Sequence, residues 1–128
     1  MKLRIKGNTA RLRLSQSEVN ELAAGRTVSD SIAFGPLPEH RLIYRVVVAD
    51  EDSAIRAELS DGVITFFLPA NAAREWAAGD VVSMEAEQEI GGESTLRILI
   101  EKDFACLNPR RGEDEADMFP NPNAGTAC

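Results

Sequence analysis

The 128-residue sequence contains little of what catalytic and metal sites are usually built from. Histidine occurs once, as His40, so a Ser-His-acid triad has a single candidate base, and no Gly-x-Ser-x-Gly turn is present. The two cysteines, Cys106 and Cys128, have no C-x-x-C spacing, which argues against a zinc site. Neither a phosphate-binding loop nor a dinucleotide fingerprint occurs. The sequence therefore indicates no cofactor and no catalytic residue, and it favours a protein that is not an enzyme.

Long apolar runs are also missing. No segment approaches the roughly 18 apolar residues that cross a bilayer, and residues 1–7 alternate basic and apolar side chains instead of forming a signal peptide. The net charge of −7 disfavours nucleic acid and anionic membranes as partners. Two late cysteines without an export signal fit a reducing compartment. We therefore expect a cytoplasmic protein.

The chain resembles itself after a shift of 54 residues. The stretch ELAAGRTVS at residues 21–29 returns as EWAAGDVVS at residues 75–83, and the apolar positions around both stretches keep the same register. A matched period and register indicate duplication of a supersecondary unit. We expect one domain of two repeats followed by an acidic tail rich in proline and asparagine. The expected bounds are 1–107 for the domain, 2–49 and 56–103 for the repeats, and 108–128 for the tail.

Each repeat predicts a β-β-α-β-β unit, beginning with a hairpin around a Gly-containing turn. Ser15 and Glu18 form a capping-box pattern that begins the first helix, and Pro69 begins the second. Gly25 and Gly79 suit the left-handed position that ends a helix. Apolar residues at i, i+3 and i+4 define the buried helix faces: Val19, Leu22 and Ala23, then Ala73, Trp76 and Ala77. The later strands are expected at residues 27–34, 41–48, 81–88 and 95–102.

The strands share one apolar face, interrupted mainly by Asp30, Gln88 and Lys102. Two short helices cannot cover such a face alone, so it must be covered by other elements or curled inward. We expect an α+β domain of eight mostly antiparallel strands in a strongly curved sheet or barrel. Two stacked sheets remain an alternative.

The opposite, polar face gathers nine Lys or Arg side chains and four Glu side chains. One interpretation is a solvated face whose cations protect sheet edges and pair with glutamates across strands. The other is an anion site, because guanidinium groups grip phosphate or carboxylate bidentately. The candidate anion-binding residues are Lys2, Arg4, Lys6, Arg11, Arg13 and Arg45. Glu85 and Glu87 are candidates for a divalent cation, although pairing with arginine is the more ordinary role.

The tail has two interpretations. Its acidic stretch, residues 113–117, is typical of a disordered segment. Met118 and Phe119 nevertheless are large enough to anchor it. The alternative hypothesis is that the tail docks against the basic hairpin of its own or a neighbouring chain.

Two resemblances add context. In circular order the elements resemble the triphosphate-tunnel (CYTH) barrels, which implies metal-dependent cleavage of triphosphates in a charged channel. The Glu-x-Glu-x-Lys strand of that family is replaced here by KLRIK at residues 2–6, and EAEQE at residues 85–89 lies in another element. Through MKLRIKGNTARLRLSQSEV, EKDFACLNPR and FPNPNA, the chain also is similar to a small bacterial family of uncharacterised proteins. That resemblance implies no activity.

Two functions stay open at this point. The first is a non-enzymatic accessory or interaction module, whose partner is a second copy of the chain or an unidentified protein. The second is a binding protein or enzyme for a phosphorylated or other anionic small molecule, which would use the basic face.

Overall fold

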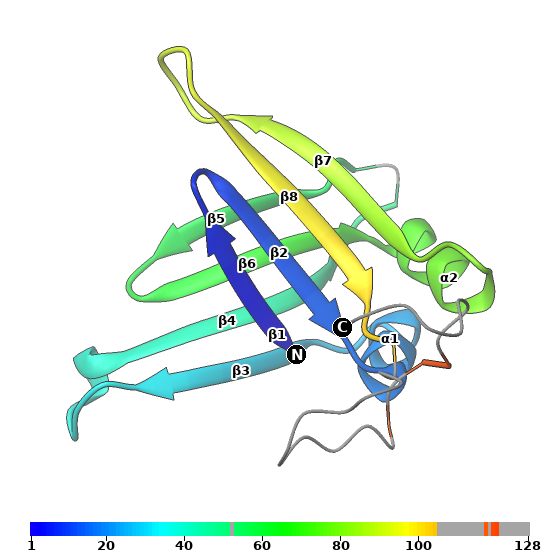
Figure 1. Cartoon of the computed structure of the whole chain (residues 1–128), viewed down its shortest axis with the longest axis horizontal. Coiled ribbons are helices and arrows are strands. Elements are labelled where there is room, and N and C mark those ends of the chain that lie inside the picture. The colour runs from blue at the N-terminus through cyan, green and yellow to red at the C-terminus, as the bar shows by residue number, and fades with distance from the viewer. Residues whose placement is uncertain (52, 105–116, 118, 121–128) are drawn as a thin grey trace.

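The computed structural model describes residues 1–51, 53–104, 117, 119 and 120, and within them it shows two four-stranded sheets and two α-helices (Figure 1). The chain is therefore an α+β protein, as predicted. The elements are β1 (Lys2–Lys6), β2 (Thr9–Leu14), α1 (Gln16–Ala23), β3 (Val28–Ala33), the 3-10 helix η1 (Pro38–His40), β4 (Arg41–Ala49), β5 (Arg56–Ser60), β6 (Val63–Pro69), α2 (Ala70–Ala78), β7 (Ser83–Glu89) and β8 (Thr95–Lys102).

Each sheet combines one hairpin from each half of the chain. Sheet A has the order β1-β2-β8-β7 and sheet B the order β3-β4-β6-β5. The outer pairings are antiparallel, whereas β2 with β8 and β4 with β6 are parallel. The sheets do not close or curl strongly, so the predicted barrel is wrong and the two-sheet alternative holds. Closure is not needed because each sheet covers the apolar face of the other.

The two sheets have equivalent strand orders when the chain is shifted by 54 residues. The registers of β1 with β2 and of β2 with β8 match those of β5 with β6 and of β6 with β4. The register of β3 with β4 differs from that of β7 with β8. Ser29 lies opposite Arg45, whereas the β7–β8 register, shifted by 54 residues, would place Ser29 opposite Val47. A difference of two residues leaves the same side chains facing the core.

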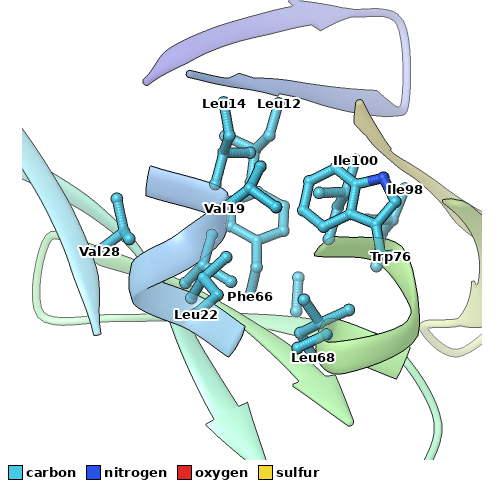
Figure 2. Close-up of a cluster of buried hydrophobic side chains, with 13 residues drawn as sticks. Leu12, Leu14, Val19, Leu22, Val28, Phe66, Leu68, Trp76, Ile98 and Ile100 are labelled. Atoms are coloured by element: carbon cyan, nitrogen blue, oxygen red, sulfur yellow. The ribbon is translucent and has the colours of Figure 1, made fainter. Parts of the chain in front are cut away.

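The core lies between the sheets at the end that holds both helices. Figure 1 shows sheet A lying across sheet B, with α1 and α2 together at one end, and the two helices are in contact. Figure 2 shows Leu22 of α1 and Trp76 of α2 among side chains of both sheets. Leu12 and Phe66, which correspond under the 54-residue shift, are fully buried in this one cluster. Ten large side chains are less than 2% exposed: Trp76, Phe66, Leu12, Leu14, Leu22, Leu68, Ile98, Ile100, Val19 and Val46.

The helix ends match the prediction except at one glycine. The Glu18 carboxylate accepts the Ser15 backbone N–H at 2.9 Å, and the Ser15 hydroxyl accepts the N–H of Glu18, which confirms the capping box. Gly25 is left-handed, with φ of 84°, as predicted. Gly79 is extended instead, with φ of −107°, so that prediction is wrong. In this conformation the Gly79 carbonyl accepts a hydrogen bond from the Lys102 ammonium group at 2.9 Å.

The described part of the tail contacts the first turn of α1. The Asp117 carboxylate accepts the Ser17 backbone N–H at 3.1 Å and the Ser17 hydroxyl, and the Asp117 carbonyl accepts the Gln16 N–H at 2.9 Å. These N–H groups have no partner inside the helix. Hydrogen bonds from the hydroxyls of Ser17 and Ser15 hold the pKa of Asp117 below its usual value. Asp117 therefore acts as an external cap of α1.

Phe119 extends this contact onto the end of β8. Its N–H donates to the Asp103 carbonyl at 2.9 Å, and its ring meets Phe104 edge-on with centroids 5.8 Å apart. The Lys102 ammonium group lies 5.1 Å from the Phe119 ring centroid. These contacts involve α1 and β8 instead of the basic hairpin proposed from sequence. The acids at 113–115, Met118 and both cysteines lie outside the described residues.

We predict that Asp117→Asn lowers the melting temperature at neutral pH. Because folding depresses the pKa of Asp117 from 3.8, its carboxylate stabilises the fold above that value, and the contribution is lost as the pH falls through the folded-state pKa. Thermal unfolding from pH 7 to pH 2 should show the two proteins converging at the acid end. Asp80→Asn, an exposed change after α2, is the control. Equal melting temperatures of wild type and Asp117→Asn at pH 7 would contradict the capping role.

Candidate functional site

An apolar cleft of about 280 Å³ lies between the sheets. Helix α1 follows the end of β2, and helix α2 follows the end of β6. The cleft is lined by residues near the starts of these two strands, so it lies at the end of the sheets away from the helices. Small and apolar side chains of both sheets form its walls: Ala10, Ala57, Ile64, Phe66 and Leu96. The cleft is thus the unfilled continuation of the core.

Three large apolar side chains stand at the rim of the cleft. Ile5, Leu59 and Ile90 line it and are 64%, 70% and 50% exposed. Ile5 and Leu59 are equivalent under the 54-residue shift and approach the cleft from different sheets. Scattered apolar residues on a surface need no explanation, whereas apolar side chains gathered around an apolar hollow form a continuous exposed patch, which is a common feature of interaction sites.

Gln88 explains one of the predicted interruptions of the apolar face. Its side-chain oxygen accepts the Ala57 N–H at 2.7 Å, and its amide nitrogen donates to the Ala57 carbonyl at 2.9 Å. The side chain thereby joins β7 of sheet A to β5 of sheet B. It occupies backbone groups that an added strand would use, so this sheet edge is protected.

The other two interruptions are also satisfied. Asp30 on β3 lies opposite Tyr44 on β4. Burial raises the pKa of Tyr44, and the negative charge of Asp30 and its hydrogen bond with Tyr44 raise that pKa further. Lys102 is buried and donates to the Gly79 carbonyl beside the Phe119 ring. Both residues therefore have structural roles away from the cleft.

The six candidate anion-binding residues do not all lie on one face of the molecule. Five of them lie on β1 and β2 and point to the outer face of sheet A: Lys2, Arg4, Lys6, Arg11 and Arg13. Arg45 lies on β4 in sheet B, where its Nε donates to the Thr65 hydroxyl at 3.0 Å. The polar face expected from sequence is therefore two outer faces that point in opposite directions.

Three of those five cations already have partners. The Lys2 ammonium group lies 3.3 Å from the Asp103 carboxylate. The Arg11 guanidinium lies 2.7 Å from the Glu101 carboxylate, and that of Arg13 lies 3.8 Å from it. Arg4 and Lys6 form no ion pair with any described residue. The sequence alone does not indicate this sharing, because it depends on the pairing of β2 with β8, which places Glu101 opposite Arg13.

The two acidic candidates on β7, Glu85 and Glu87, both lie beside Arg97 of β8. The Glu85 carboxylate lies 3.0 Å from the Arg97 guanidinium, and Glu87 lies opposite Arg97 in the β7–β8 register. In residues 1–51 and 53–104 and the described tail positions, no group of three or more His, Cys, Asp or Glu side chains is placed to hold a metal ion.

His40 holds a turn. Its Nδ1 accepts the Leu37 N–H at 3.3 Å, and its carbonyl accepts the Phe34 N–H at 2.8 Å. A Cβ atom at Gly35 would lie 2.3 Å from this ring nitrogen, so the close packing requires glycine. The single histidine is therefore placed for turn structure and lies apart from the cleft.

These features define a two-sheet α+β protein with an apolar cleft at the end opposite its helices. Residues 1–123 match the family described as a family of unknown function (DUF7009), and the protein belongs to that family. No curated protein and no solved structure matches the chain significantly. The resemblance to an uncharacterised family is thus confirmed, and nothing supports the triphosphate-tunnel resemblance. None of the described helices is both long and apolar enough to cross a membrane.

We predict that Gln88→Met lowers the free energy of unfolding by about 1–3 kcal/mol, because it leaves the Ala57 backbone groups without partners. The change keeps the length of the side chain. Gln16→Met, the same change at an exposed position on α1, should cost less than about 0.5 kcal/mol. Urea unfolding of both variants measures the difference. Equal unfolding free energies would show that the bridge between β7 and β5 contributes nothing.

Proposed function

We propose that the protein is a non-enzymatic interaction module that buries an apolar group of a binding partner in the cleft. The observation that carries this proposal is the continuity of the apolar walls with the exposed rim of Ile5, Leu59 and Ile90. Covering these side chains removes apolar surface from water, which is the main favourable term in protein association.

The size and polarity of the cleft support binding over catalysis. An apolar cavity of about 150 Å³ accommodates benzene, so about 280 Å³ fits one or two apolar side chains. Small-molecule sites are typically about 300–1,000 Å³ and contain polar groups that orient the ligand. Here the Asn8 amide already donates to the Thr95 carbonyl at 2.6 Å, and the Gln88 amide is held by Ala57. The cysteine usage also favours a cytoplasmic setting for this module.

We predict that indole, a probe of about the size of one large side chain, shifts the backbone amide resonances of Ala10, Ile64 and Leu96. Ala10→Leu fills the cleft and should weaken indole binding at least about tenfold, because one wall then occupies the ligand's place. Ala33→Leu places the same side chain on exposed β3 and should leave binding unchanged. Circular dichroism checks that both variants fold. Indole binding that persists in Ala10→Leu would overturn the proposal.

A second candidate function is binding of a phosphorylated or other anionic small molecule on β1. The observation that favours it is that Arg4 and Lys6 are exposed cations without a described counter-ion. Lys2, Arg11 and Arg13 contribute less, because carboxylates already neutralise them.

We predict for this second function that tripolyphosphate raises the melting temperature of the wild type and that the effect disappears in Arg4→Ala/Lys6→Ala. Arg26→Ala/Arg74→Ala removes two cations at the helical end and serves as the control. An equal response of both double variants would show general charge screening and exclude a site on β1.

We also infer that the two halves arose by duplication of one β-β-α-β-β unit. The 54-residue sequence match supports this inference, and so does the equivalent strand order of the two sheets. In such a module two related hairpins line the cleft, β1–β2 from the first half and β5–β6 from the second.

A further inference from the structure

The outer face of sheet B, which points away from sheet A, carries an apolar stripe along its two central strands. Its side chains alternate with those of Val46 and Phe66, which are buried in the core, so the stripe faces the other way. Sheet A and both helices contribute to that core, and no helix or strand of the described residues lies over the stripe. The stripe consists of four half-buried residues: Ile43 and Val47 on β4, and Val63 and Phe67 on β6.

Sheet A shows what a solvated outer face looks like in this fold. The 54-residue shift aligns Val47 with Glu101 and Phe67 with Arg13, and these two residues of sheet A form an ion pair with each other. The remaining correspondences are Ile43 with Arg97, Val63 with Thr9, and, in the middle row, Arg45 with Leu99. Four equivalent positions are thus polar on sheet A and apolar on sheet B. Sheet B therefore presents apolar surface where the fold accepts charge, which is a feature of interaction surfaces.

A cation and an acid lie within and beside this stripe. Arg45 is exposed in the middle of it, donates to the Thr65 hydroxyl at 3.0 Å, and forms no ion pair with any described residue. Glu58 on β5 lies opposite Thr65, on the side away from β4. Its carboxylate is 3.8 Å from the Arg56 guanidinium, and both side chains are exposed. Glu58 is therefore accessible to a second cation.

We propose that a second copy of the chain covers the outer face of sheet B, in a twofold dimer that stacks sheet B on sheet B. Stacked sheets of this kind keep their strands within about 30° of each other. In a twofold dimer the same patch serves both copies, so the patch must complement itself. The proposal is independent of the cleft, which lies on the opposite side of sheet B.

The charges select one orientation of the two copies. A dyad that runs along the strands, between β4 and β6, places β4 of each copy over β6 of the other. The register of β4 with β6 keeps their apolar side chains level, so those of one strand meet those of the other across the interface. Arg45 then meets Thr65 of the second copy, one strand away from Glu58. A dyad across the strands would instead oppose Arg45 to Arg45, which like charges disfavour.

Val47→Glu/Phe67→Arg tests the face by sedimentation velocity. It gives sheet B the residues that sheet A carries at the equivalent positions, so the fold should tolerate it, and circular dichroism checks that it does. The variant should dimerise at least about tenfold more weakly than the wild type, because charges replace the apolar contact. Leu99→Glu, an apolar-to-charged change on the outer face of sheet A, should dimerise like the wild type.

Arg45→Glu tests the orientation. It places an acid near Glu58 of the second copy and should also weaken the dimer at least about tenfold, whereas Arg45→Glu/Glu58→Arg restores opposite charges and should restore the dimer. Failure of this rescue overturns the proposed orientation. A wild type that stays monomeric up to millimolar concentration, or a Val47→Glu/Phe67→Arg variant that dimerises as the wild type does, overturns the dimer itself. Indole binding in the cleft should be the same in all these variants, so the two proposals fail separately.

Discussion

Two parallel strand pairings, β2 with β8 and β4 with β6, hold the molecule together. Each joins a hairpin from one half of the chain to a hairpin from the other, so neither sheet is complete without both halves. The core depends on the same exchange, because Leu12 and Ile100 of sheet A and Phe66 of sheet B are buried in one cluster. Burial of this shared apolar surface is the main favourable term available to the fold.

The cleft follows from where the helices are attached. Because α1 follows β2 and α2 follows β6, and these strands hold equivalent places in the two sheets, both helices lie at the same end. Trp76 and Leu22 fill the space between the sheets there. Neither α1 nor α2 reaches the other end, and small side chains such as Ala10 and Ala57 leave a hollow there. One connectivity therefore produces a dense core at one end and an open apolar cleft at the other.

Local structure could be predicted from the sequence, but strand pairing could not. Alternation and the Ser15–Glu18 capping box identify the hairpins and α1, because these signals act between close neighbours. The pairing of Thr9 with Arg97 joins distant positions, and the alternating pattern is the same in a barrel and in two stacked sheets. Gly79 similarly contacts a residue that is distant in sequence, because its carbonyl accepts a hydrogen bond from Lys102, and no residue near Gly79 indicates this contact.

The cleft could not be predicted from the sequence either, because the pattern of apolar residues does not show which of them stay exposed. Ile5 and Leu59 alternate with polar neighbours in the same way as core residues do, so the sequence assigns them to the core. In the structure they face inward at the end where nothing covers them, and they stay exposed. Inward-facing apolar residues that remain exposed show where the space between the two sheets is not filled by side chains of the protein itself. Because water at this surface is released when an apolar group covers it, the unfilled end of the core is the physical basis of the binding role that we propose for the cleft.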